Sequence, residues 1–171
     1  MSFYKKSTVG YIYFLVFTFI GLSMGNAISQ TKFEPLDEYL AARPKWNKEP
    51  NELSYVGMRC ASLYWVIAGH FQANGNNKEH EETAEKLKKY GTTNFTVAYS
   101  IGIAEGGANM SKEALMARSR NLTMIYADDV KSAKSVANNV FAGYIQRDFQ
   151  ICNQMLESVQ RAELALFEKN K

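Results

Sequence analysis

The sequence predicts an all-α protein, an antiparallel bundle of about four helices with an N-terminal arm and one interhelical disulfide. Apolar residues recur at steps of three and four over long stretches of the 171-residue chain, as they do along one face of an α-helix. Breaks that are rich in glycine and asparagine separate these stretches. The chain has two cysteines, Cys60 and Cys152, and each lies on the apolar stripe of a predicted helix.

Residues 1–27 have the layout of a secretory signal peptide. Lys5 and Lys6 precede a long apolar stretch, and this stretch ends in small residues, with Gly25 and Ala27 at the positions that a signal peptidase reads. The sequence therefore predicts a cleaved signal peptide.

An uncleaved membrane anchor is the alternative, because residues 8–27 are long enough for a span of about 20 residues. In both cases residues 28–171 are expected outside the cytoplasm, in the periplasm or the extracellular space, as a single helical-bundle domain. With an anchor, this domain would be held at the inner membrane.

The charge balance gives no reason to expect a nucleic acid or an anionic lipid as partner. The chain has 20 basic and 17 acidic residues, and removal of the two signal lysines leaves 18 basic residues against 17 acidic ones. A surface of mixed charge is the simplest interpretation. We expect no nucleic acid, a membrane partner only if the N-terminal segment stays uncleaved, and possible contact with another envelope protein.

Residues 28–50 are predicted to form the N-terminal arm, which contains a short helix. Pro35 suits a first helical turn, and Pro44 ends the helix. A long, buried helix follows, and it ends near Asn74, where Gly75 suits a left-handed cap. Its apolar stripe contains Leu53, Val56, Cys60, Leu63, Tyr64, Ile67 and Phe71.

The next segment begins as a charged, solvated helix, but the chain beyond Gly91 supports two interpretations. Strict alternation of apolar residues from Phe95 to Ile103 is typical of a strand. We favour helical continuation, because a lone buried strand would leave its backbone donors unpaired. The continued helix would gather small residues into one seam, formed by Ala84, Gly91, Ala98 and Gly102.

Two further helices complete the bundle. Ser111 can cap the first of them, and Glu113 in its first turn suits the helix dipole. Asn138 and Asn139 mark a bend or an interruption, and the last helix carries its apolar stripe through Cys152.

Cys60 and Cys152 are predicted to form a disulfide, because their number is even and the predicted compartment is oxidising. The bond would join the second helix to the last across 92 residues of sequence, for which chain entropy gives a stabilisation of about 4 to 5 kcal/mol. A redox or metal-binding thiol is the alternative, but the chain has no CxxC motif.

A polar pair is predicted beside the disulfide. In an up-and-down bundle, Tyr64 lies one turn after Cys60, and Asp148 lies one turn before Cys152 on an antiparallel helix. We expect the Tyr64 hydroxyl to meet the Asp148 carboxylate, because an apolar stripe rarely tolerates an unpaired acid. Arg59 is the rival partner for Asp148.

The motifs RCASLYWVIAG and IQRDFQIC resemble those of small exported helical proteins of marine bacteria and their viruses. These proteins share an R-C-x-x-L-Y motif, matched by Arg59, Cys60, Leu63 and Tyr64, and an I-x-x-D-x-x-x-C motif, matched by Ile145, Asp148 and Cys152. The resemblance covers two short motifs and implies a shared architecture without any catalytic role.

No catalytic, metal-binding or cofactor-binding residues are predicted. Ser100 in AYSIG resembles a nucleophile elbow, but no histidine follows it in the chain. His70 and His80 lack the spacing of a metal site. We therefore expect a non-catalytic binding or structural component of the cell envelope. The alternatives are a carrier of a small apolar ligand within the bundle and an enzyme with an unrecognised site.

Overall fold

The computed structural model describes residues 33–75, 77–105 and 111–169. The chain divides into two units, Met1–Phe33 and Glu34–Lys171, and all helices described below belong to the second unit. The predicted signal peptide or anchor lies outside the described residues. No described residue is in a strand, which confirms the all-α prediction. In chain order the helices are α2 (Leu36–Ala41), the 3₁₀ helix η1 (Trp46–Lys48), α3 (Pro50–Asn74), α4 (Lys78–Glu105), α5 (Lys112–Ala137) and α6 (Tyr144–Lys169).

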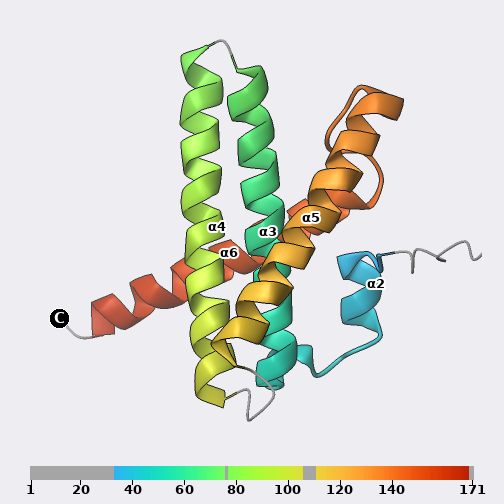
Figure 1. Cartoon of the computed structure of the whole chain (residues 1–171). Helices are drawn as coiled ribbons and strands as arrows, with labels where there is room; N and C mark the ends of the chain where they lie inside the picture. Colours follow the sequence, from blue (N-terminus) through green and yellow to red (C-terminus); the bar gives the residue numbers. More distant parts are fainter. Residues whose placement is uncertain (1–32, 76, 106–110, 170–171) are drawn as a thin grey trace, which may run out of the picture. The chain divides into compact units, whose positions relative to one another are not determined.

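The helix α3 is the centre of this unit and contacts α4, α5, α6 and η1. Figure 1 shows α3 and α4 as an antiparallel hairpin, with α5 inclined to it and α6 crossing it. Pro50 begins α3 at a position where the missing amide hydrogen costs nothing. The apolar stripe predicted from the sequence is largely buried, because Val56, Cys60, Leu63 and Ile67 have no exposed surface.

The helix α4 runs without interruption to Glu105, which confirms the helical interpretation beyond Gly91 and rejects the strand. The four small residues of the predicted seam are buried, and three of them, Gly91, Ala98 and Gly102, lie against α3. A methyl group built on Gly57 would lie 2.7 Å from the Ala98 Cβ atom, so the two backbones approach closely at this point. Ser54 strengthens the contact by donating a hydrogen bond of 2.8 Å to the Ala98 carbonyl oxygen.

The helix α5 begins and ends where the sequence indicated. The Ser111 hydroxyl accepts a hydrogen bond from the Ala114 amide, as expected of a capping residue. Asn138 ends the helix in the left-handed conformation, with φ of 50°. The cap predicted at Gly75 was wrong, because this residue is extended, with φ of −90°.

Candidate functional site

The predicted disulfide between Cys60 and Cys152 is present and has a Cα–Cα distance of 5.3 Å. Neither cysteine has exposed surface. The bond joins α3 to α6, the helix that crosses α3 in Figure 1. Because such bonds persist in oxidising surroundings, the disulfide indicates an oxidising compartment.

Arg59, next to this disulfide, is fully buried and donates hydrogen bonds to three different segments. Its NH2 group donates to Asp148 Oδ2 of α6 at 2.7 Å, and its Nε atom donates to the Tyr126 hydroxyl of α5 at 3.1 Å. Its NH1 group donates to the Glu34 carbonyl oxygen at 2.9 Å. We call Arg59, Tyr126 and Asp148 the Arg59 cluster.

Asp148 is the common acceptor of this cluster and is also fully buried. Besides Arg59, the Tyr126 hydroxyl donates to its Oδ2 atom at 2.5 Å, and the Leu36 amide at the start of α2 donates to its Oδ1 atom at 2.6 Å. Burial raises the pKa of Asp148 above its ordinary value, although Arg59 and the two other donors favour the charged carboxylate. The rival pairing of Arg59 with Asp148 is therefore the one that the protein forms.

The predicted hydrogen bond between Tyr64 and Asp148 was wrong. The Tyr64 hydroxyl donates instead to Asn153 Oδ1 at 2.7 Å, one residue beyond the disulfide. The prediction assumed that α6 runs antiparallel alongside α3, whereas α6 crosses α3 (Figure 1), so a one-turn offset does not transfer between the two helices. Burial raises the pKa of Tyr64 above its ordinary value of 10.0.

Sequence reasoning missed the role of Tyr126. No local pattern could have paired it with Asp148, because the two residues lie on different helices, 22 positions apart. Two other tyrosines make similar bonds to carboxylates, Tyr39 to Glu52 and Tyr144 to Asp129. Tyrosine–carboxylate contacts are thus a repeated means of joining helices in this unit.

The Arg59 cluster has no access to solvent, and its two charged groups, those of Arg59 and Asp148, are paired with each other. The three side chains have no exposed surface, so a substrate could reach them only if the helices separated. The cluster therefore holds α2, α3, α5 and α6 together, and it offers no free group for chemistry. Among the described residues, no three histidine, cysteine or acidic side chains lie together as a metal-binding group.

An open apolar cleft with a volume of about 490 Å³ lies between α4 and α5, with Trp65 of α3 in its lining. Figure 1 shows α4 and α5 close to one another at one end and separating toward the other. Ligand pockets commonly measure about 300 to 1,000 Å³. We call this feature the α4–α5 cleft; it is lined by Trp65, Phe95, Met116, Ser119, Arg120, Thr123 and Met124.

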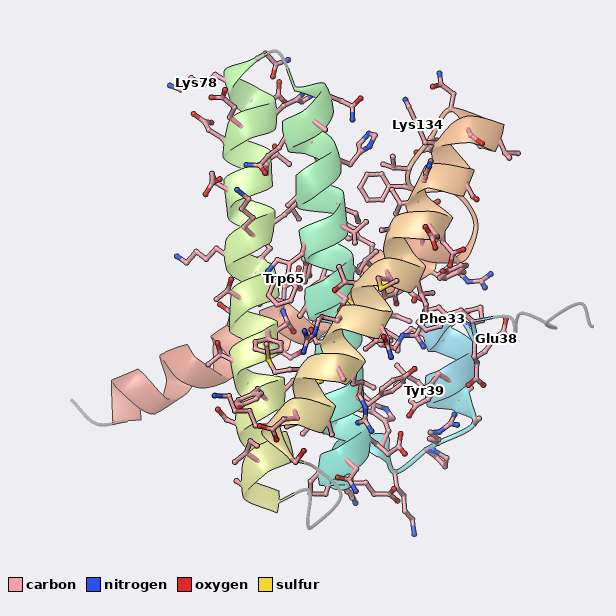
Figure 2. All side chains as sticks on the ribbon, in the orientation of Figure 1. Phe33, Glu38, Tyr39, Trp65, Lys78 and Lys134 are labelled. Carbon is pink, nitrogen blue, oxygen red and sulfur yellow. A yellow bond between two sulfur atoms is a disulfide. The ribbon has the colours of Figure 1, made fainter. Side chains whose placement is uncertain are left out.

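Aromatic rings form one side of the cleft. Trp65 and Phe95 have ring centroids 5.4 Å apart, and Phe95 stacks on Tyr99 at 5.6 Å. Trp65 points from α3 toward α4 (Figure 2), where a methyl group built on Gly91 would lie 2.6 Å from its indole ring. The glycine thus leaves the space that the indole ring occupies.

The other side of the cleft is formed by α5, where two apolar side chains are exposed to solvent. Met124 is 66% exposed and Met116 is 37% exposed. Methionine is flexible and polarisable, so it adapts to ligands of varied shape. A second hollow, lined by Val97 and Met155 among others, measures about 140 Å³, which is too small for an organic ligand of ordinary size.

Comparisons with protein-family models, with curated proteins and with solved structures found no match to this chain. The resemblance to small exported helical proteins therefore stays a prediction. Within the described ranges, every helix is too short or too polar to cross a bilayer.

Proposed function

We propose that the protein is an exported, non-catalytic binding component of the cell envelope and that it holds its ligand in the α4–α5 cleft. The N-terminal signal pattern and the buried disulfide support export to an oxidising compartment. The observation that carries the proposal is the cleft itself, which combines aromatic rings, exposed methionines and an adequate volume in one place.

The cleft also favours a carrier of a small apolar ligand, which is one form of this function. Its volume suits a small organic molecule, and its lining is almost entirely apolar. It is open at the surface, so a ligand can enter without a rearrangement of the helices. A protein partner would instead bury Met124 and Met116 against an apolar side chain of its own.

An enzyme would need ionisable groups with perturbed pKa values that converge in an accessible cleft. The perturbed carboxylate, Asp148, is fully buried and paired with Arg59. The cleft contains one ionisable side chain, that of Arg120. This arrangement supports binding better than catalysis.

Native mass spectrometry of the protein purified from the envelope tests the proposal. We expect a bound species on the unmodified protein that is lost in Met124→Glu, because this variant places a charge in the cleft at a position exposed enough to tolerate it. Val136→Glu is the matched control, since Val136 also lies on α5 and is 87% exposed but does not line the cleft.

The control should retain the bound species. Absence of any bound species on the unmodified protein, or equal retention by Met124→Glu, would contradict the proposal.

A further inference from the structure

From the lining of the α4–α5 cleft we infer that its ligand is a small amphipathic anion, with a flat apolar body against Trp65 and Phe95 and one negatively charged group at Arg120. This inference rests on the proposed binding function and adds the chemical class of the ligand.

The rings select the apolar body. The planes of Trp65 and Phe95 are inclined by 45° with ring centroids 5.4 Å apart, and both residues line the same space. A flat or conjugated group packs well against such a pair. Met116 and Met124 lie in the same lining and can adapt to the outline of the bound group.

Arg120 provides the single charge of the cleft. Its Nε atom donates to the Met116 carbonyl oxygen at 3.3 Å, and this bond to its own helix orients the side chain. Among the described residues, no carboxylate forms an ion pair with Arg120. The two terminal nitrogens of the guanidinium group can therefore donate to an anion, in the fork geometry that suits a carboxylate, sulfonate or phosphate group.

No acidic residue lies three or four positions from Arg120 on α5. The residues three and four positions away on the same helix face are Met116, Ala117, Thr123 and Met124. Across the cleft, α4 has no charged side chain between Tyr90 and Ala104. A cation beside an apolar, uncharged wall is complementary to a ligand that has an apolar body and one negative group.

Two fluorescent probes that share one ring system can test this inference. Anilinonaphthalene sulfonate carries a negative group, and phenylnaphthylamine has the same rings without it. Trp46→Phe leaves Trp65 as the one tryptophan, since the chain has two, so energy transfer from Trp65 locates the probe. Both probes are titrated into the disulfide-linked protein purified from the envelope.

We expect both probes to bind at one saturable site and to accept energy from Trp65. Arg120→Gln should weaken the binding of the sulfonate probe about tenfold and the binding of the neutral probe less than about twofold. Only the sulfonate forms a charge-assisted hydrogen bond with Arg120. Lys131→Gln is the matched control, since it removes the same charge from α5 about three turns away. This control should leave the binding of both probes unchanged.

Equal effects of Arg120→Gln on the two probes overturn the inference but leave the binding function in place. If native mass spectrometry shows a protein bound in the cleft, the binding function likewise stands and the inference fails. If neither probe binds and no species is lost in Met124→Glu, both the inference and the proposed function are wrong.

Discussion

The Arg59 cluster and the α4–α5 cleft both include residues of α3 and α5, but the arginine in each has a different environment. Arg59 has no exposed surface and donates to a carboxylate, a hydroxyl and a carbonyl oxygen. Arg120 lines an open hollow and bonds only to a carbonyl oxygen of its own helix among the contacts observed. A buried charged group needs hydrogen-bond and ion-pair partners because its desolvation is costly. A charged group at the surface is hydrated, so it can remain without a protein partner and bind a ligand.

The comparison separates the part of the protein that determines the fold from the part that is free to bind. Each bond of the Arg59 cluster joins two segments that are distant in sequence, so the cluster specifies how the helices meet. The cleft lies where α5 separates from α4, and its lining residues, all within the described part of the chain, form no hydrogen bond between these two helices. Substitutions in the cluster should therefore affect stability, and substitutions in the cleft should affect binding.

The largest loss of stability is expected for Arg59→Met. This variant leaves Asp148 buried without its cation and should lower the free energy of unfolding by about 3 to 5 kcal/mol, measured by denaturant titration. Arg147→Met is the control, because Arg147 pairs with Asp37 at a half-exposed site and should cost about 1 kcal/mol or less.

The double variant Arg59→Met, Asp148→Leu should recover part of this loss, because it removes both buried charges together but also removes the acceptor of the Tyr126 hydroxyl and the Leu36 amide. If Arg59→Met proved no more costly than Arg147→Met, the cluster would not determine the arrangement of the helices.

The second effect concerns the disulfide. Cys60→Ala, Cys152→Ala should lower the free energy of unfolding by about 2 to 4 kcal/mol, because the bond restricts the unfolded chain over 92 residues and measured gains are commonly smaller than the chain-entropy value. In the native protein without reductant, both cysteines should resist alkylation in mass spectrometry, since they are paired and buried. An alkylated native protein, or an equally stable variant, would show that the crosslink does not hold α6 to α3.

A smaller effect distinguishes the two buried tyrosines near the disulfide. Tyr126→Phe removes a hydrogen bond to the Asp148 carboxylate and should lower the free energy of unfolding by about 1.5 to 3 kcal/mol. Tyr64→Phe removes a neutral bond to Asn153 and should cost about 0.5 to 1.5 kcal/mol. Denaturant titration measures both losses, and the reverse order would contradict the assignment of Tyr126, instead of Tyr64, as the tyrosine that donates to Asp148.

The smallest expected effect comes from the two glycines Gly91 and Gly69. Gly91→Ala places a methyl group against the Trp65 indole and should cost about 1 to 3 kcal/mol while changing the tryptophan emission. Gly69→Ala is the matched control, because it makes the same substitution in α3 at a position where nothing lies within 4 Å of the added methyl group. This control should stabilise the protein by about 0.5 to 1 kcal/mol, the usual gain of alanine over glycine in a helix. If Gly91→Ala were also stabilising, the glycine would not be what leaves room for Trp65.

The sequence by itself determined the helices and the disulfide. Periodicity and capping act over a few residues, so the apolar stripe of α3, the Ser111 cap and the break at Asn138 could all be identified locally. The pairing of Cys60 with Cys152 followed because the chain offers no other choice. Even the disputed segment after Gly91 could be assigned, since a single strand would have had nothing to pair with.

Only the tertiary structure decided which polar groups meet and where the surface is hollow. The partner of Tyr64 depends on how α6 crosses α3, and the contact between Tyr126 and Asp148 joins two helices whose mutual orientation no local pattern specifies. The α4–α5 cleft likewise depends on the separation of α4 from α5, which brings Phe95 and Arg120 into one lining from distant positions. Local interactions select secondary structure, whereas the angles between helices follow from the packing of all side chains at once.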